Sequence, residues 1–230
     1  MFTADDRLFV LTGAGVSAES GLATFRGSGG LWNGHRVEDV ATPNAWLADP
    51  ALVWRFYSMR RRDAEAAAPN AAHHALASLE QRLGDNFFLC TQNVDDLHER
   101  AGSQRVHHMH GSLFQSRCTR CEQPFPDRSI NDGPRLPRCF VCGATVRPHI
   151  VWFGEMPLQM DLIYQRLYRS TTLLVVGTSG SVYPAAGFAQ HALARGIATV
   201  YVGPEEPLNS ECFGTIHLGP ATEVLPRILA

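Results

Sequence analysis

Short apolar runs recur along the chain and are separated by longer segments of mixed polarity. Nearly every position in each run is apolar, which is typical of strands that are buried on both faces of a parallel sheet. We therefore predict five strands of this kind, at residues 7–12, 86–91, 149–153, 172–177 and 197–202.

Helical segments lie between these predicted strands. We predict helices at residues 51–68, 70–83, 158–170 and 184–195. The last of them begins on Pro184 and stops before Gly196, as helix ends prefer. Strands and helices that alternate in this way predict an α/β fold, with a Rossmann-like parallel sheet and helices on both of its faces.

Two segments depart from this alternation. Residues 116–147 are rich in Cys, Pro and Arg, and we expect a small inserted zinc-ribbon module there. Residues 36–84 are rich in helix and should form a second insertion. The Rossmann-like domain would then comprise residues 1–35, 85–115 and 148–230.

The composition limits the possible partners. The 230 residues carry a net charge of −2, so the chain as a whole is not expected to bind nucleic acid. The N-terminal segment has two acids ahead of a short apolar run, unlike a signal peptide, and no segment approaches the roughly 18 apolar residues of a membrane span. We expect a cytoplasmic protein that has no contact with a membrane.

The cysteines form the most specific single motif. Cys118, Cys121, Cys139 and Cys142 make two Cys-x-x-Cys pairs with 17 residues between them, a spacing found in zinc sites. Four thiolates close the tetrahedral shell of one Zn²⁺, so the ion should be structural. The same module holds six arginines and three acids, which keeps a nucleic-acid-binding zinc module open as an alternative.

Small and polar residues follow several predicted strands. Residues 13–18, Gly-Ala-Gly-Val-Ser-Ala, fit the fingerprint in which backbone amides approach a dinucleotide pyrophosphate, although a plain turn also fits. No second strand ending in an acid follows, so the nicotinamide end should be bound differently from that of a dehydrogenase. The other polar strand ends are Gln92, Asn93 and Asp95, and Gly177, Thr178 and Ser179. For these the alternatives are helix and turn caps.

Two further positions suggest chemistry. His110 belongs to a cluster of three histidines, and because the cysteines already provide a metal site, we take it as a candidate general base rather than a metal ligand. Tyr57 and Arg60 stand three residues apart in a predicted helix, so they share a face. A phenol beside a guanidinium suits a carboxylate ligand, whereas the alternative is a solvated helix face.

Taken together, these motifs resemble the sirtuins, the NAD-dependent protein lysine deacylases. The segments GAGVSAESGLATFRG, TQNVDDLH, HGSL, the four cysteines, VRPHIVWFGE and GTSGSVYPAAGF follow one another in the family's order. Tyr57 and Arg60 match the Tyr-x-x-Arg pair of the class III branch, which is found in bacteria and mitochondria.

The resemblance implies a role for each motif. NAD would be bound by Gly13, Ala14, Gly15, Ala18, Phe25, Arg26, Trp32, Gln92, Asn93, Asp95, Gly177, Thr178, Ser179, Glu205 and Ala221. The acylated lysine would lie near Tyr57 and Arg60, and its backbone would pair with the segment Val151, Trp152, Phe153 and Gly154. One departure is Gly203, which stands where the family often has an asparagine near the adenosine ribose.

The implied reaction is acyl transfer. The acyl oxygen attacks C1′ of the nicotinamide ribose, nicotinamide leaves, and His110 takes a proton from a ribose hydroxyl that then attacks the acyl carbon. The products are lysine, nicotinamide and O-acyl-ADP-ribose. We expect a deacylase that removes succinyl, malonyl and acetyl groups. An NAD-dependent ADP-ribosyltransferase is the alternative enzyme, and the sequence does not predict the oligomeric state.

Overall fold

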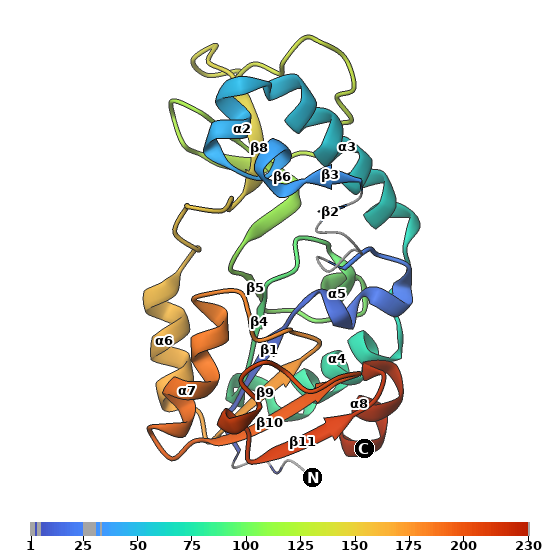
Figure 1. The fold of residues 1–230 in the computed structure, drawn as a ribbon, viewed down its shortest axis with the longest axis vertical. Helices are drawn as coiled ribbons and strands as arrows, with labels where there is room; N and C mark the ends of the chain where they lie inside the picture. The colour runs from blue at the N-terminus through green and yellow to red at the C-terminus, as the bar shows by residue number, and fades with distance from the viewer. Residues whose placement is uncertain (1–2, 4–5, 25–30, 33, 230) are drawn as a thin grey trace.

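The centre of the protein is a parallel sheet of six strands. The computed structural model describes residue 3 and residues 6–24, 31, 32 and 34–229. The strand order is β11-β10-β9-β1-β4-β5 (Figure 1). These strands are β1 Leu8–Thr12, β4 Phe87–Thr91, β5 Val106–His108, β9 Thr172–Val176, β10 Ala198–Gly203 and β11 Thr215–Leu218.

Strand β1 is buried at all five positions because each of its faces is covered by helices. Leu8 and Val10 pack into one core, with α4 (Ala71–Leu83) and α8 (Ala221–Leu229). Phe9 and Leu11 pack into the other core, with α6 (Met160–Arg169) and α7 (Phe188–Leu193). Figure 1 shows these two helix pairs on opposite sides of the sheet. Burial on both sides explains the continuous apolar runs.

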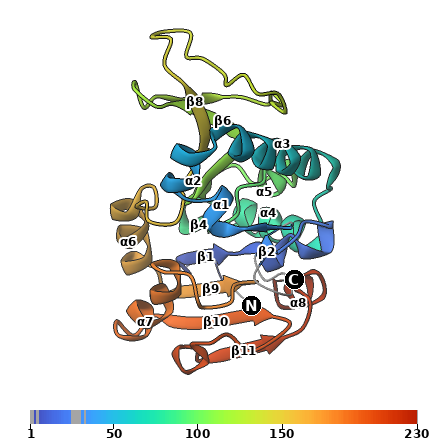
Figure 2. The ribbon, with the colours of Figure 1, turned by 45° about the horizontal axis from the view of Figure 1, so that its top comes forward.

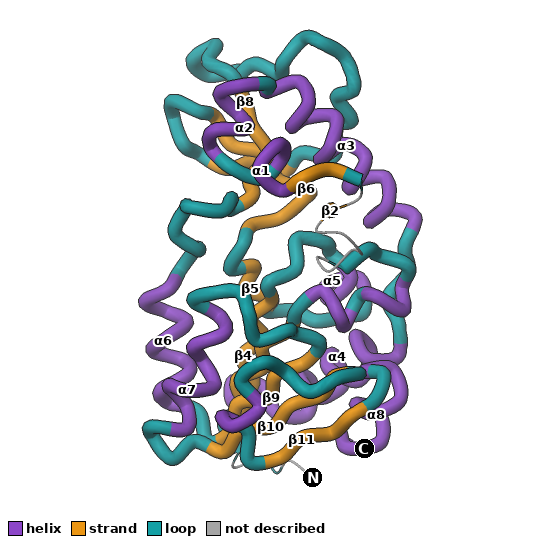
Figure 3. The backbone as a smooth tube through the Cα atoms, in the orientation of Figure 1, coloured by secondary structure: helices purple, strands orange, loops and turns teal. Residues whose placement is uncertain are grey.

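The prediction of a central strand at 149–153 is wrong. Strand β8 runs from Val146 to Ile150 and pairs antiparallel with β6 (Gly111–Cys118), which also pairs with β7 (Pro124–Pro126). This three-stranded sheet lies at the opposite end of the molecule from β11 (Figure 2; strands orange in Figure 3). The apolar run is buried in a separate core. An apolar sequence shows that a segment is buried, but it does not show which core buries it.

The other four predicted strands are confirmed as β1, β4, β9 and β10, within a residue or two at each end. Three predicted helices are confirmed as α3 (Pro50–Ala66), α4 and α6. The fourth is divided into a 3₁₀ turn, Ala185–Gly187, and the short α7. Strands β5 and β11 were missed because both lie at sheet edges and are only partly buried, so they lack a continuous apolar run.

Helix α3 belongs to a smaller lobe above the main sheet (Figure 2). The lobe also contains the hairpin of β2 (Leu31–Trp32) and β3 (His35–Arg36), together with α1 (Val37–Val40) and α2 (Pro43–Ala48). Its core joins α3 to the three-stranded sheet through Val53, Phe56, Leu113 and Ile150. Helix α4, by contrast, packs against α8 on the main sheet. None of the helices in the described residues has the length and apolar composition needed to span a bilayer.

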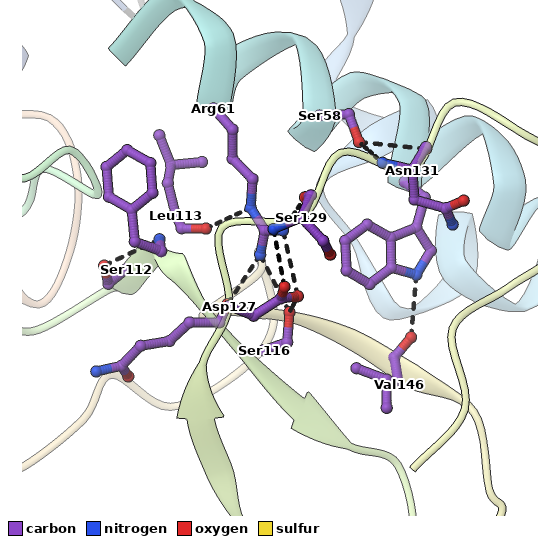
Figure 4. A network of polar contacts seen from close by, with 12 residues as sticks. Ser58, Arg61, Ser112, Leu113, Ser116, Asp127, Ser129, Asn131 and Val146 are labelled. Atoms are coloured by element: carbon purple, nitrogen blue, oxygen red, sulfur yellow. Dashed lines mark hydrogen bonds and ion pairs between the residues drawn. The ribbon is translucent and has the colours of Figure 1, made fainter. Parts of the chain in front are cut away.

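The side chain of Arg61, which is 0% exposed, connects α3 to the cysteine-rich module (Figure 4). Its Nε atom donates to the Leu113 carbonyl at 2.6 Å, and its Nη1 atom donates to the Ser129 carbonyl at 2.5 Å and to Asp127 Oδ2 at 3.2 Å. Ser116 donates to the same Asp127 oxygen at 2.6 Å. A buried guanidinium is tolerated only when its donors are satisfied, so these acceptors fix where the module sits on α3.

Replacement of Arg61 by methionine should therefore destabilise the protein by about 3 kcal/mol, because Asp127 and two carbonyl groups lose their buried donor. Urea unfolding of both proteins measures this difference. The matched control is Arg62→Met on the same helix, because Arg62 is about half exposed and its ion pair with Asp132 should contribute less than about 1 kcal/mol. Equal losses in the two variants would contradict the structural role of Arg61.

Candidate active site

A cleft of about 460 Å³ lies between the main sheet and the smaller lobe. Its floor comes from the loops that follow β1, β4, β9 and β10, which is where open parallel sheets bind ligands. The predicted cofactor residues that line it are Gly13, Ala14, Gly15, Trp32, Gln92, Asn93, Asp95, Gly177, Thr178, Ser179 and Glu205.

Four residues of the cofactor prediction are not among those that line the cleft. Ala18 is exposed on the surface, and Ala221 is buried at the start of α8. Phe25 and Arg26 lie outside the described residues. The other eleven predicted cofactor residues line the cleft, whereas these four are not part of its lining in the described residues.

Glycines let the loops after β1 and β9 touch directly. The Gly15 amide donates to the Gly177 carbonyl at 2.9 Å, and a Cβ atom on Gly15 would lie 2.7 Å from the Gly177 Cα. Gly177 also has a φ of +62°, which disfavours any side chain. The loop after β1 forms short 3₁₀ turns, Ala14–Val16 and Ala18–Ser20, instead of a long helix. The two loops can therefore approach each other closely at this edge of the sheet, because neither has a side chain at the contact.

One end of the cleft carries a hydrogen-bonded set of neutral and acidic side chains. Asn93 Nδ2 donates to Ser17 Oγ at 3.0 Å, and Ser17 Oγ lies 3.3 Å from Asp95 Oδ2. Burial raises the pKa of Asp95, while the Leu97 amide, which donates to its other oxygen at 3.2 Å, opposes that rise. Asp95 therefore lines the cleft and also accepts from the first residue of α5 (Leu97–Arg100), so a place in the cleft and a contact with the helix start coexist.

Ser17 was not predicted as a site residue, although it lines the cleft and is 1% exposed. Behind it lies His73, whose Nε2 is 3.4 Å from Ser17 Oγ. Burial lowers the pKa of His73 to about 4, so the ring is neutral at physiological pH. The sequence did contain a signal, which is a serine inside the glycine loop. A hydroxyl that is buried in such a loop is expected to be hydrogen-bonded.

Of the three clustered histidines, only His110 lines the cleft. Its Nδ1 lies 3.2 Å from the Gln92 carbonyl, an acceptor that requires a proton on Nδ1 and so leaves Nε2 to accept one. Burial lowers the pKa of His110, and the bond to Gln92 offsets part of that change. By contrast, His107 contacts Gln159, and His108 pairs with Glu99 at 2.7 Å. The arrangement suits His110 to act as a base near neutral pH.

The other end of the cleft holds the guanidinium of Arg60, and two of its nitrogen atoms have no hydrogen-bond acceptor among the described residues. Tyr57 and Arg60 of α3 both line it, and the Arg60 guanidinium stacks on the Trp32 ring at 4.1 Å. The Nε and Nη1 atoms of Arg60 are buried and have no hydrogen-bond acceptor among the described residues. Burial raises the pKa of Tyr57 to about 12, so its hydroxyl keeps its proton. The alternative of a solvated helix face is therefore wrong for these two residues.

The predicted peptide-binding segment also lines the cleft, from Val151 to Gly154. Three of its four backbone amides already have partners. Val151 donates to the His110 carbonyl at 2.9 Å and Phe153 to the Ala41 carbonyl at 3.0 Å. The Trp152 amide donates to Glu155 Oε2 at 2.8 Å. An added peptide strand would therefore have to donate to the carbonyl groups of this segment or accept from the Gly154 amide.

The side chain of Tyr201 explains the glycine at position 203. A Cβ atom on Gly203 would collide with the Tyr201 hydroxyl, which donates to the Thr178 carbonyl at 3.0 Å. Tyr201 itself lines the cleft and was not predicted. The tyrosine thus occupies the volume that a longer residue at position 203 would need.

The four predicted zinc ligands come together. The sulfur atoms of Cys118, Cys121, Cys139 and Cys142 all lie within 4.8 Å of one another, compatible with the roughly 3.8 Å separation of a tetrahedral Zn–thiolate site. The amides of Arg120 and Cys121 both donate to Cys118 Sγ at 3.3 Å, and two such donors stabilise the thiolate form of this sulfur. None of the four cysteines lines the cleft, which fits a structural ion.

Most arginines of the module have partners inside the protein. Arg117 and Arg147 pair with Glu155, and Arg128 pairs with Asp96 at 2.8 Å. Arg120 donates to the Cys142 carbonyl at 2.6 Å, and the Cys142 thiol raises the pKa of Arg120. These contacts pair three of the six arginines with carboxylates and hold a fourth on a backbone carbonyl.

Comparison with known proteins agrees with this geometry. A family profile described as "Sir2 family" matches residues 13–184. The NAD-dependent protein deacylase of Caulobacter vibrioides is 52% identical over an alignment of 235 positions, which covers 97% of each protein. That of Pasteurella multocida is 49% identical over 228 residues, again 97% of each.

Solved structures agree with the fold along nearly the whole chain. A Sir2 homologue in complex with NAD has a TM-score of 0.90 and 44% identity, covering 98% of this chain and 89% of that one. A Sir2 mutant with a p53 peptide and NAD has a TM-score of 0.82 and 30% identity, covering 98% and 93%.

Replacement of Cys139 by alanine should remove the zinc, because three ligands cannot close the tetrahedral shell. We expect less than about half a zinc ion per chain and a melting temperature lower by about 5 °C or more. Metal analysis and thermal unfolding measure both. The matched control is Cys90→Ala, which removes a buried thiol of the main sheet and should leave the zinc content unchanged. Full zinc occupancy in the Cys139 variant would contradict the site.

Proposed function

The chain belongs to the Sir2 family and is an NAD-dependent protein lysine deacylase with a structural zinc site, and we propose that it prefers acyl groups that end in a carboxylate. Succinyl-lysine and malonyl-lysine in proteins are the substrates of this kind. The proposal rests on Arg60, whose Nε and Nη1 atoms are buried in the cleft without an acceptor among the described residues.

A buried guanidinium without acceptors is unfavourable, and a carboxylate is the ligand that best satisfies it. The planar fork of Arg60 can donate two parallel hydrogen bonds to one carboxylate, and the Tyr57 hydroxyl can add a third. An acetyl group offers no such acceptor at its methyl end. Charge-assisted bonds contribute about 1.5–3 kcal/mol, which corresponds to roughly a 10- to 150-fold preference in kcat/KM for succinyl over acetyl.

The residues of the cleft also fit NAD. The contact between Gly15 and Gly177 leaves room and backbone groups for a pyrophosphate, and the buried Ser17, Asn93 and Asp95 provide polar atoms for a carboxamide and a ribose. When bound, NAD supplies the ribose carbon to which the acyl oxygen is transferred. The protein's own part is to hold the acyl chain on Arg60 and to keep His110 Nε2 ready to accept a proton.

An ADP-ribosyltransferase is a weaker proposal for this cleft. A transferase would have no need for a buried guanidinium beside the acyl position, whereas an acyl carboxylate requires it. The relatives that are about half identical are named as deacylases. We propose the cytoplasm as the place of action, on the sequence alone.

The variant His110→Tyr should lower deacylation turnover about 100-fold or more, because it removes the proton acceptor. Binding of NAD and acyl-peptide should change little, and calorimetry measures it separately from turnover. The control is His107→Asn, since His107 lies outside the cleft lining and should be dispensable. Near-normal turnover in a correctly folded His110 variant would assign the base elsewhere.

The pH profile gives a second test of the same residue. Because burial lowers the pKa of His110, its neutral form persists to lower pH than that of an ordinary histidine. Turnover should rise with pH as His110 loses its proton, with a midpoint below about 6.5. A midpoint clearly above that value would contradict the assignment.

The variant Arg60→Met should lower kcat/KM for a succinyl-peptide by about 10-fold or more and should spare the acetyl-peptide, because only the succinyl carboxylate uses the guanidinium. Arg55→Met is the matched control, since Arg55 is exposed on the same helix and pairs with Asp49 at 3.9 Å. Mass spectrometry of the peptide products measures both rates. Equal losses with the two peptides would refute the proposed preference.

A further inference from the structure

Trp152 links the zinc-side lobe to the acyl end of the cleft. The residue is 2% exposed, and three contacts hold it, one through its backbone and two through its indole. Its backbone amide donates to Glu155 Oε2 at 2.8 Å, the Arg147 guanidinium lies 3.2 Å from its ring centroid, and its Nε1 donates to the Tyr57 hydroxyl at 3.1 Å. An indole with so many contacts has little freedom to rotate away from Tyr57.

The bond between Trp152 and Tyr57 determines whether the Tyr57 hydroxyl can donate or accept a further hydrogen bond. An indole N–H is only a donor, so the Tyr57 oxygen must accept this bond. The phenolic proton is then directed away from Trp152, and it has no acceptor among the described residues. The Tyr57 hydroxyl therefore enters the cleft as a donor, one helical turn from the donors of Arg60.

The charged groups near Trp152 are paired with one another. Arg147 forms a bidentate pair with Glu155 at 2.7 and 3.0 Å and also donates to the Ile150 carbonyl. Arg117 contacts the same carboxylate at 3.2 Å. The Nε1–H group of Trp152 is the direct polar contact between this residue and Tyr57.

We propose that Trp152 is a positioning residue for acyl specificity, whose indole N–H holds the Tyr57 hydroxyl as a donor to the acyl carboxylate. This inference rests on the proposed preference for carboxylate-ended acyl groups and adds a residue that does not itself touch the carboxylate. If the inference holds, loss of the N–H group lowers kcat/KM more for succinyl-peptides than for acetyl-peptides. A purely structural role of Trp152 would lower both alike.

The variant Trp152→Phe keeps an aromatic ring beside Arg147 but removes the N–H group. We expect its succinyl-to-acetyl ratio of kcat/KM to fall about 3- to 10-fold, the effect of one neutral hydrogen bond. The matched control is Trp46→Phe, because Trp46 packs on Trp152 with ring centroids 5.8 Å apart and does not line the cleft. That variant should keep the parental ratio.

A double-mutant cycle with Tyr57→Phe tests the route of the effect. If Trp152 acts through the Tyr57 hydroxyl, Trp152→Phe should leave the ratio unchanged once that hydroxyl is absent. A fall in the ratio that is the same in both backgrounds, or equal losses with the two peptides, overturns the inference. A parent enzyme without succinyl preference overturns the proposed function as well, whereas a succinyl-to-acetyl ratio that is unchanged in Trp152→Phe overturns the inference alone.

Discussion

The buried guanidinium of Arg61 holds α3 against the cysteine-rich module, and the acyl end of the cleft depends on that contact. Its acceptors come from Leu113, Asp127 and Ser129, all in or next to the module. Because a charge removed from water must keep its partners, α3 cannot turn or slide without a large cost. The same helix carries Tyr57 and Arg60, so the Arg61 contacts also set where those two side chains point.

Three adjacent arginines on α3 illustrate how neighbouring positions diverge. Arg60 lines the cleft with two buried donors that have no acceptor in the part of the chain that the structure describes. The donors of Arg61 are satisfied inside the protein, and Arg62 is about half exposed beside Asp132. Successive helical residues are about 100° apart around the axis, so they meet three different environments. A satisfied cation contributes to stability, whereas one without acceptors in a cleft is available to a ligand.

The two ends of the cleft differ in their electrostatics, and each comes from a different part of the fold. On the sheet side, Ser17, Asn93 and Asp95 bond to one another and are supported by the neutral His73. On the lobe side, Arg60 and the Tyr57 hydroxyl are donors. His110 lies in the turn between β5 and β6 and lines the same cleft, and its Nδ1 contacts the carbonyl of Gln92, the residue that follows β4.

Local patterns in the sequence determined the elements that are buried in a regular way and the sites whose ligands are spaced along the chain. Strands β1, β4, β9 and β10 and the Cys118 to Cys142 ligand set were predictable because continuous burial and a fixed thiol spacing are written in consecutive residues. The place of β8 was decided only by the tertiary structure, since an apolar run does not specify which core will cover it. The same is true of Arg61 and of the bond from Trp152 to Tyr57, because their partners lie 52 to 95 residues away and sequence spacing carries no information about such contacts.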